Sequence, residues 1–216
     1  MIVVLLGPPG AGKGTQGERI AHALGVPKIA TGDVIRAAMS AGTALGREAK
    51  AFYDRGDLVP DHVIMGIIRE ALAAPEQARG VVLDGVVRTV PQAEGLASVL
   101  QGLGRALDRV LLFAIPDEQL VTRLSGRTMC SACQTPFSGR APGELHEECL
   151  KSPKGTLVRR QDDEPEAVRN RLRVYNAQTA PVIGWYRAHA ANVVEIDATG
   201  TPDAVAVRAF AAVGLG

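Results

Sequence analysis

Residues 7–15 read GPPGAGKGT, and this stretch decides the fold. A short apolar run, residues 2–6, precedes it, and a helical pattern begins at Lys13. This order of strand, loop and helix is typical of a phosphate-binding loop, in which glycines let successive backbone N–H groups point at phosphate oxygens. The helix N-terminus adds the positive end of its dipole. We therefore predict a phosphate site to which Lys13 contributes a point charge.

The loop differs from the general pattern at the magnesium position. A hydroxyl residue usually follows the lysine directly, whereas here Gly14 follows it and Thr15 comes one place later. Thr15 or a water molecule must then serve the magnesium ion. The alternative interpretation is a glycine-rich turn without a ligand, but this would leave the lysine and the strand–helix context unexplained.

Strand and helix patterns alternate around this loop. Five short aliphatic runs predict buried parallel strands, at residues 2–6, 27–30, 81–83, 110–115 and 193–196. Helical patterns separate them: one over residues 13–24 ending at Gly25, one capped by Asp61, one capped by Asp117, and one from Pro165 to about residue 190 that Pro181 should kink. The alternation predicts an α/β fold with a mostly parallel sheet covered on both faces.

Composition narrows the function. The chain has 216 residues, of which 46% are hydrophobic and 22% charged, and its net charge is +1. This balance predicts a folded core and argues against general binding to nucleic acids or membrane surfaces, which needs a strong basic excess. No apolar run reaches the length of a membrane span, and residues 1–6 lack the features of a signal peptide. We expect a cytoplasmic monomer.

Residues 128–157 break the alternation with three cysteines, three prolines and no clear period. The segment is too long for an ordinary loop, so we interpret it as an inserted subdomain. It contains the pattern C-x2-C…H-x2-C, formed by Cys130, Cys133, His146 and Cys149, which is typical of a closed structural zinc site. A redox-active pair at Cys130 and Cys133, or simply free thiols, are the alternatives.

Further motifs resemble the adenylate kinase family along almost the whole chain. The loop variant with Gly14 and Thr15 resembles that family's version, and Leu83 to Gly85 with Arg88, Thr89 and Gln92 resembles its second substrate segment. The resemblance implies a P-loop NTPase fold with a five-stranded parallel sheet. It also implies a core of residues 1–30, 60–126 and 164–216, a monophosphate-binding insert of residues 31–59, and a mobile lid of residues 127–163.

The resemblance implies reversible, Mg²⁺-dependent phosphoryl transfer between ATP and AMP. The residues implied to surround the transferred group are Lys13, Asp84, Arg88, Arg123, Arg127, Arg160 and Arg171. Those implied to hold ATP are Gly10, Ala11, Gly12, Lys13, Gly14, Thr15, Arg123 and Arg127. Those implied to hold AMP are Thr31, Gly32, Arg36, Val59, Gly85, Arg88, Gln92, Arg160 and Arg171. Asp162 and Asp163 are implied to form hydrogen bonds when the lid closes, and the lid's C/H cluster to bind Zn²⁺.

The chemistry agrees with these assignments. An AMP phosphate is already an anionic nucleophile, so the reaction needs positioning and charge neutralisation rather than a general base. Arginine suits this role because its planar guanidinium binds phosphate through two hydrogen bonds. Asp84 ends an apolar strand, where an acid approaches magnesium in phosphate-loop folds, although a turn or cap residue is the alternative. Gln92 offers a donor and an acceptor to adenine, or else it simply faces solvent.

One position departs from the family. The family usually has Phe-Pro immediately before the arginine that matches Arg88, and this chain has Val86 and Val87 there. The family's proline usually follows a cis bond, which is costly for other residues. Either the loop is trans here and Arg88 is held differently, or a strained bond survives.

Other functions remain open from the sequence. A related kinase could use GTP as donor, or UMP or CMP as acceptor; Gln92 and the long lid favour AMP. A small-molecule kinase, such as one acting on shikimate or gluconate, would share the loop but not the segment from Thr31 to Arg36. A zinc-bearing nucleic-acid module with a degenerate loop is disfavoured by the neutral charge, the few aromatics and Lys13.

Overall fold

The computed structural model describes residues 1–54, 59–133, 135–159, 163–189 and 192–215. Its strands are β1 (Ile2–Leu6), β2 (Lys28–Ala30), β3 (Val81–Asp84), β4 (Arg109–Ala114), β5 (Arg127–Cys130), β6 (Pro136–Ser138), β7 (Leu157–Val158) and β8 (Val193–Asp197). Its helices are α1 (Lys13–Leu24), α2 (Thr31–Ala41), α3 (Ala44–Tyr53), α4 (Asp61–Ala73), η1 (Pro75–Gln77), α5 (Val90–Gly102), α6 (Asp117–Ser125), α7 (Pro165–Val174), η3 (Tyr175–Thr179), α8 (Ala180–His189) and α9 (Pro202–Ala212).

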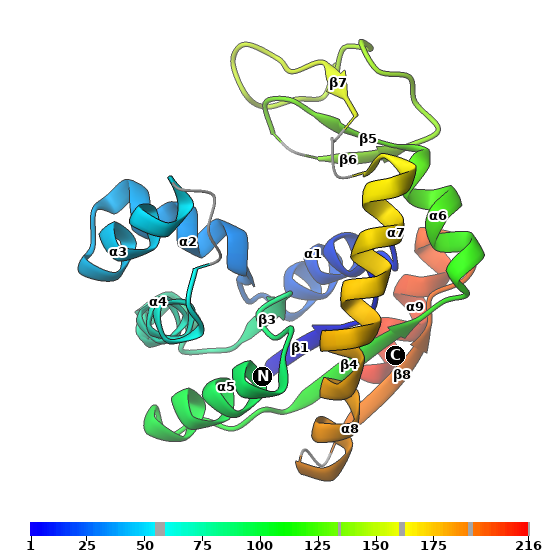
Figure 1. The fold of residues 1–216 in the computed structure, drawn as a ribbon. Coiled ribbons are helices and arrows are strands. Elements are labelled where there is room, and N and C mark those ends of the chain that lie inside the picture. Colours follow the sequence, from blue (N-terminus) through cyan, green and yellow to red (C-terminus); the bar gives the residue numbers. More distant parts are fainter. Residues whose placement is uncertain (55–58, 134, 160–162, 190–191, 216) are drawn as a thin grey trace.

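A five-stranded parallel sheet in the order β2-β3-β1-β4-β8 forms the centre of the molecule (Figure 1). Each of its strands matches the predicted run to within one residue at either end. The chain leaves the central strand β1 toward β2 on one side and later reaches β4 on the other. Loops that follow β1 and its two neighbours therefore meet at one edge of the sheet, which is where open α/β sheets bind ligands.

Both faces of the sheet are covered, which explains the uninterrupted apolar run of β1. Ile2, Val4 and Leu6 pack into a cluster with residues of α4, α5 and α8. Val3 and Leu5 point to the opposite face and pack with α1, α6, α7 and α9. All five side chains are at most 3% exposed. The period-two alternation of a strand thus divides one apolar run between two cores.

Two helix starts lie one residue from the predicted positions. Asp61 and Asp117 are the first residues of α4 and α6, while Pro60 and Pro116 occupy the cap positions. Neither helix has a side-chain cap, so both aspartates were wrongly predicted as caps. A carboxylate in the first turn still interacts favourably with the helix dipole.

The long C-terminal helix continues past Pro181, but it widens into a π-helical turn just before this residue. Here α7 passes into a π-helical turn, η3, and then into α8. The amide of Ala180 donates to the carbonyl of Tyr175, five residues back. Proline has no N–H and clashes with the carbonyl four residues before it, and a wider turn relieves this clash.

The segment predicted as irregular contains a second sheet. Strands β6-β5-β7 pair antiparallel and lie apart from the central sheet, between the ends of α6 and α7 (Figure 1). On another side of the molecule, α2 and α3 project from the core beside α4 (Figure 1). In the described part of the chain, no helix is both long and apolar enough to span a membrane.

Candidate active site and metal centre

The phosphate-type loop between β1 and α1 is built by close backbone contacts. Gly7 has φ +140° and lies against the carbonyl of Phe113, where a Cβ would come within 2.6 Å of the oxygen. The ammonium of Lys13 donates to the carbonyls of Gly7 (2.6 Å) and Pro8 (2.8 Å). These two bonds tie the end of the Lys13 side chain to the start of the loop.

The electrostatics of Lys13 identify its neighbours. Burial lowers its pKa from 10.5 to about 8, and the negative charge of Asp84 partly opposes this shift. The positive charges of Arg88, Arg171 and Arg127 lower the pKa of Lys13 further. Four other residues predicted to surround the transferred phosphoryl group are therefore close enough to act electrostatically on the Lys13 ammonium.

Asp84 ends β3 beside the loop. A Cβ added to Gly14 would lie 3.5 Å from its Oδ2 atom, so the carboxylate faces the start of α1. Thr15, the predicted alternative ligand for magnesium, is half-buried in the next position of that helix.

Asp163 joins two predicted arginines. Its side chain is fully buried and accepts from Arg127 Nε (2.7 Å) and Nη2 (2.6 Å) and from Arg171 Nη1 (3.2 Å). Two guanidiniums compensate the buried carboxylate, and the bidentate pair fixes the orientation of Arg127. Arg160 and Asp162, which were also predicted for this region, lie outside the described residues.

The predicted monophosphate segment starts at the same edge of the sheet. The hydroxyl of Thr31 donates to the carbonyl of Gly85 (2.8 Å), which ties the start of α2 to the loop after β3. Arg36 pairs with Asp33 at 2.5 Å, and both side chains are about two-thirds exposed. A Cβ at Gly32 would lie 3.1 Å from the guanidinium of Arg36. Arg36 is thus accessible from solvent above the first turn of the helix.

Gln92 is buried and is committed to protein partners. Its Oε1 accepts from the backbone N–H of Arg88 (2.8 Å), and its Nε2 donates to Asp61 (2.7 Å). It is 7% exposed, so the solvent-facing alternative is wrong. One lone pair and one N–H of its amide remain for an adenine edge.

The loop before Arg88 adopts trans peptide bonds. Among the described residues, the only cis bond precedes Pro153. Val86 and Val87 are 1% and 2% exposed and pack into the core cluster beneath the loop. The two valines therefore anchor this loop by burial, and Arg88 follows them on the exposed side.

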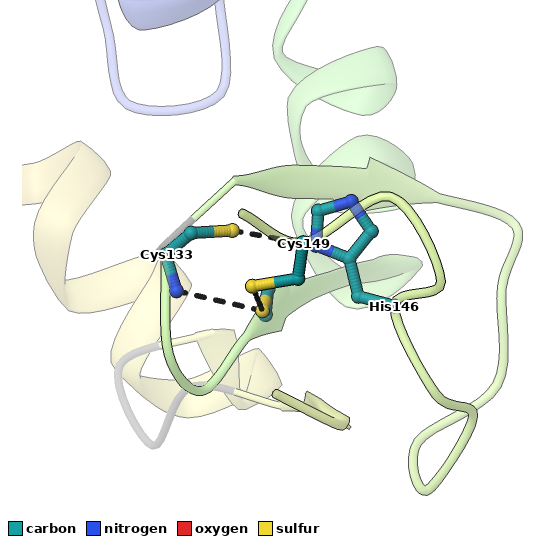
Figure 2. A group of neighbouring side chains, drawn as sticks. Cys133, His146 and Cys149 are labelled. Carbon is teal, nitrogen blue, oxygen red and sulfur yellow. Dashed lines mark hydrogen bonds between the residues drawn. The ribbon is translucent and has the colours of Figure 1, made fainter. Parts of the chain in front are cut away.

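The four predicted metal ligands come together beside the second sheet, and Figure 2 labels Cys133, His146 and Cys149 of this group. The ligand atoms of Cys130, Cys133, His146 and Cys149 all lie within 4.8 Å of one another. Cys130 and Cys149 are 3.7 Å apart at their Sγ atoms, and Cys133 Sγ is 3.3 Å from Nδ1 of His146. Hydrogen bonding by Thr135 lowers the pKa of Cys133 to about 6, which favours the thiolate that binds metals.

Small and aromatic residues shape this cluster. Gly155 lies against it so closely that a Cβ there would be 2.5 Å from the sulfur of Cys130. Phe137 meets the ring of His146 edge to face at 4.8 Å, with the guanidinium of Arg140 5.1 Å from the Phe137 ring centre. The imidazole is thereby oriented by packing as well as by its sulfur partner.

Comparison with known proteins agrees with this geometry. A family model described as Adenylate kinase matches residues 5–191. The chain belongs to the adenylate kinase family. It is 64% identical over 215 residues to an adenylate kinase of Gemmatimonas aurantiaca, and 44% identical over 214 residues to one of Geobacter sp. strain M21. These alignments cover 100% and 99% of both chains, respectively.

Membership of the adenylate kinase family confirms the fold and the enzyme class predicted from the sequence. The chain is a nucleoside monophosphate kinase, which is a phosphotransferase. The nucleic-acid module and the small-molecule kinases are excluded as families for this chain.

Sequence reasoning missed the loop after β8, which contacts a predicted arginine. Arg123 donates from Nη2 to the carbonyls of Ala198 (2.9 Å) and Gly200 (3.3 Å). Gln16, buried beside the phosphate loop, donates to the carbonyl of Pro202 (2.8 Å). The available signal was position, because this loop follows a parallel strand at its carboxyl end.

Proposed function

We propose that this chain catalyses ATP + AMP = 2 ADP at the edge of the sheet where the loops after β1 and β3 meet. The observation that carries the proposal is that the charges of Asp84, Arg88, Arg127 and Arg171 all act on the ammonium of Lys13 beside a phosphate-type loop. Four cations gathered in this way suit substrates that together carry several negative phosphate oxygens.

The residues have distinct roles in this proposal. Lys13 and the loop amides bind the β- and γ-phosphates of ATP, together with Arg123 of α6 and Arg127 of β5. Arg36 and Arg88 hold the phosphate of AMP in line with the γ-phosphorus. Asp163 orients Arg127 and Arg171 toward the transferred group. The AMP phosphate attacks directly, so the protein supplies alignment and charge neutralisation rather than a base.

Magnesium fits the oxygen groups beside the loop. Thr15 and Asp84 would hold the ion, directly or through water, because Mg²⁺ prefers oxygen ligands and retains several waters. When bound with ATP, the ion would neutralise part of the charge on the phosphates. The approach of the Asp84 carboxylate to position 14 supports this placement.

The cluster in the second sheet fits a structural zinc ion. Tetrahedral Zn–S bonds of about 2.3 Å place two sulfurs about 3.7–3.8 Å apart, and Cys130 and Cys149 are separated by 3.7 Å. Three cysteines and one histidine fill four positions, which is typical of a closed site that holds structure rather than substrate. These spacings favour zinc over a redox pair or free thiols.

The predicted division into core, insert and lid remains part of the proposal. Residues 31–59 would close over AMP and residues 127–163 over ATP, so that water is kept from the transferred group. The predicted boundary lies just before α4, and this helix packs on both parts: on the insert through Val63 and Ile67, and on the core through Ile68 and Leu72. A monomeric state and a cytoplasmic location also remain predictions.

A coupled assay for ADP tests the proposed reaction. With magnesium, ATP and AMP should give two ADP per turnover, and the reaction without added magnesium serves as control. GTP as donor, and UMP or CMP as acceptor, should each react more slowly. Faster reaction with another pair would reassign the substrates, and failure to form ADP from ATP and AMP would contradict the function.

A further inference from the structure

The backbone of Arg88 is held on both sides. Its N–H donates to Oε1 of Gln92 (2.8 Å), as described above, and its carbonyl accepts from the hydroxyl of Thr179 (2.9 Å). A carbonyl can only accept, so the hydroxyl of Thr179 must be the donor. Gln92 is four residues away in the chain, whereas Thr179 is 91 residues away. The second bond therefore joins two separate parts of the fold.

Thr179 makes this bond from an unusual position. It is the last residue of the π-helical turn η3, two places before Pro181. In an α-helix a threonine hydroxyl often bonds the carbonyl of its own preceding turn. Here the hydroxyl reaches across to the loop after β3. Isolated π-helical turns occur frequently at functional sites.

The same helical rod carries a second arginine of the site. Turn η3 continues directly from α7, which contains Arg171. Arg171 bonds Asp163, and Asp163 bonds Arg127 of the second sheet. The rod formed by α7 and η3 is thus linked through Asp163 to Arg127 of the second sheet, and through Thr179 to the backbone of Arg88.

We propose that Thr179 is a positioning residue for the acceptor side of the reaction. Its hydroxyl sets where the peptide of Arg88 stands relative to Arg171, and so where the AMP phosphate is held relative to the transferred group. The buried valines before Arg88 restrain the loop by packing, and the bond from Thr179 adds a directional restraint on the Arg88 carbonyl. This inference rests on the proposed role of Arg88 in AMP binding.

Replacing the hydroxyl tests the inference. Thr179→Val keeps the β-branched shape and removes the donor, and it should raise KM for AMP about threefold to tenfold, as expected when one neutral hydrogen bond is lost. KM for ATP should change less than twofold. Thr179→Ser restores the hydroxyl and should restore KM for AMP. The matched control is Ser98→Ala, which removes a helix hydroxyl that bonds only its own helix, at the carbonyl of Glu94.

A purely structural role would look different. It would lower the melting temperature while leaving the ratio of the two KM values unchanged, and that result would overturn the inference. Thr179→Ala removes the same hydroxyl without the β-branch and provides a second folded variant if valine disturbs the turn. Unchanged KM for AMP in the folded variants would also overturn it.

A double-mutant cycle separates this inference from the role on which it depends. Arg88→Ala should itself raise KM for AMP, and adding Thr179→Val should then have little further effect, because Thr179 acts through Arg88. Fully additive effects would show that Thr179 acts elsewhere. If Arg88→Ala left AMP binding intact, the proposed role of Arg88 would fall and the inference with it. If only Thr179→Val were silent, the inference alone would fail.

Discussion

The ammonium of Lys13 donates hydrogen bonds to the backbone carbonyls of Gly7 and Pro8. These carbonyls compete with the phosphates of ATP for the N–H donors of Lys13. Burial lowers the pKa of Lys13 to about 8, so near pH 8 about half of these side chains are in the charged ammonium form. Bound phosphates would favour the charged form and raise this pKa. Nucleotide binding near pH 8 should therefore take up protons, and affinity for ATP should fall as the pH rises above 8.

Lys13→Met is expected to lower turnover about 100-fold to 1,000-fold, because a charge aimed at the transferred group is lost. It should also remove the proton uptake, which calorimetry in two buffers of different ionisation enthalpy can measure. The control is Lys50→Met, which changes an exposed lysine paired with Asp54 on α3. Near-normal turnover in Lys13→Met would contradict the assignment of the loop.

Arg36→Ala is expected to raise KM for AMP about 10-fold to 100-fold, the size of a lost charge-assisted hydrogen bond or pair of bonds. KM for ATP should stay nearly constant. The exposed Arg36–Asp33 pair contributes little to folding, so the melting temperature should also hold. Arg69→Ala, at an exposed position on α4, is the matched control. Equal losses for both nucleotides would contradict an acceptor role.

At the scale of elements, a single glycine lets α3 pack against α2. A Cβ at Gly46 would lie 2.0 Å from the backbone carbonyl oxygen of Ala38, and a backbone atom cannot move aside as a side chain would. Gly66 of α4 is similarly close to Leu45 of α3, at 2.6 Å. These contacts hold the three helices around the small cluster of Ala49, Val63 and Ile67.

Gly46→Ala is therefore expected to destabilise the protein by about 1–3 kcal/mol, the usual cost of overpacking. Each kcal/mol corresponds to a fall of about 2–4 °C in Tm at this chain length. Gly184→Ala is the matched control, because that glycine lies within α8 and its Cβ would meet nothing within 4 Å. It should be neutral or stabilising by up to about 1 kcal/mol. Equal thermal stability of the two variants, measured by calorimetry, would refute the packing argument.

The second sheet depends on its ligand cluster because it has little apolar core. Of the three buried residues in its cluster, two are the proposed ligands Cys130 and Cys149, and the third is Leu157. Three short strands do not bury enough surface to be stable alone. A metal crosslink would replace that missing core, and metal binding would be coupled to folding of the sheet.

Purified protein is expected to contain about one zinc per chain. Cys133→Ser should release the metal and lower Tm, while part of the activity survives at low temperature because no ligand is proposed to touch substrate. His146→Ala tests the fourth ligand separately. Elemental analysis that finds no metal in protein prepared without chelator would disprove the zinc site. If zinc affinity were unchanged in His146→Ala, the zinc site would stand, but His146 would not be its fourth ligand.

At the scale of the whole molecule, the second sheet and the α2–α3 pair stand on separate sides of the core (Figure 1). The predicted ligands of ATP and AMP are distributed over these parts, with Arg127 on β5 and Arg36 on α2. If both arginines act on the bound nucleotides as proposed, we expect these parts to approach each other when the substrates bind.

An analogue that joins two adenosines through five phosphates should bind tightly and compact the molecule, as expected for lids that exclude water. Small-angle scattering should show a smaller radius of gyration with saturating analogue. AMP alone should cause a smaller change, since it engages one of the two moving parts. An unchanged radius with the analogue bound would exclude closure as proposed.

The central sheet and the phosphate-type loop were both predictable from the order of the residues alone. A strand that is buried on both faces must be apolar throughout, so the apolar run before residues 7–15 predicts β1. The loop is local as well, because its shape depends on glycines that are neighbours in the chain. The metal pattern shares this property, since spacing alone brought Cys130, Cys133, His146 and Cys149 to notice, and the structure gathers them within 4.8 Å.

Contacts between distant segments could not be predicted from the sequence and became known from the folded chain. The bond of Thr179 to Arg88, the pairing of Asp163 with Arg127, and the contact of Arg123 with the loop after β8 each join different elements. A side chain in sequence shows which hydrogen bonds it can make but not which partner folding brings to it. The distortion of the C-terminal helix near Pro181 could be predicted from the sequence, because the missing N–H of a proline is a local property. A hydrogen-bond partner from another part of the fold is not a local property, so these contacts could not be predicted.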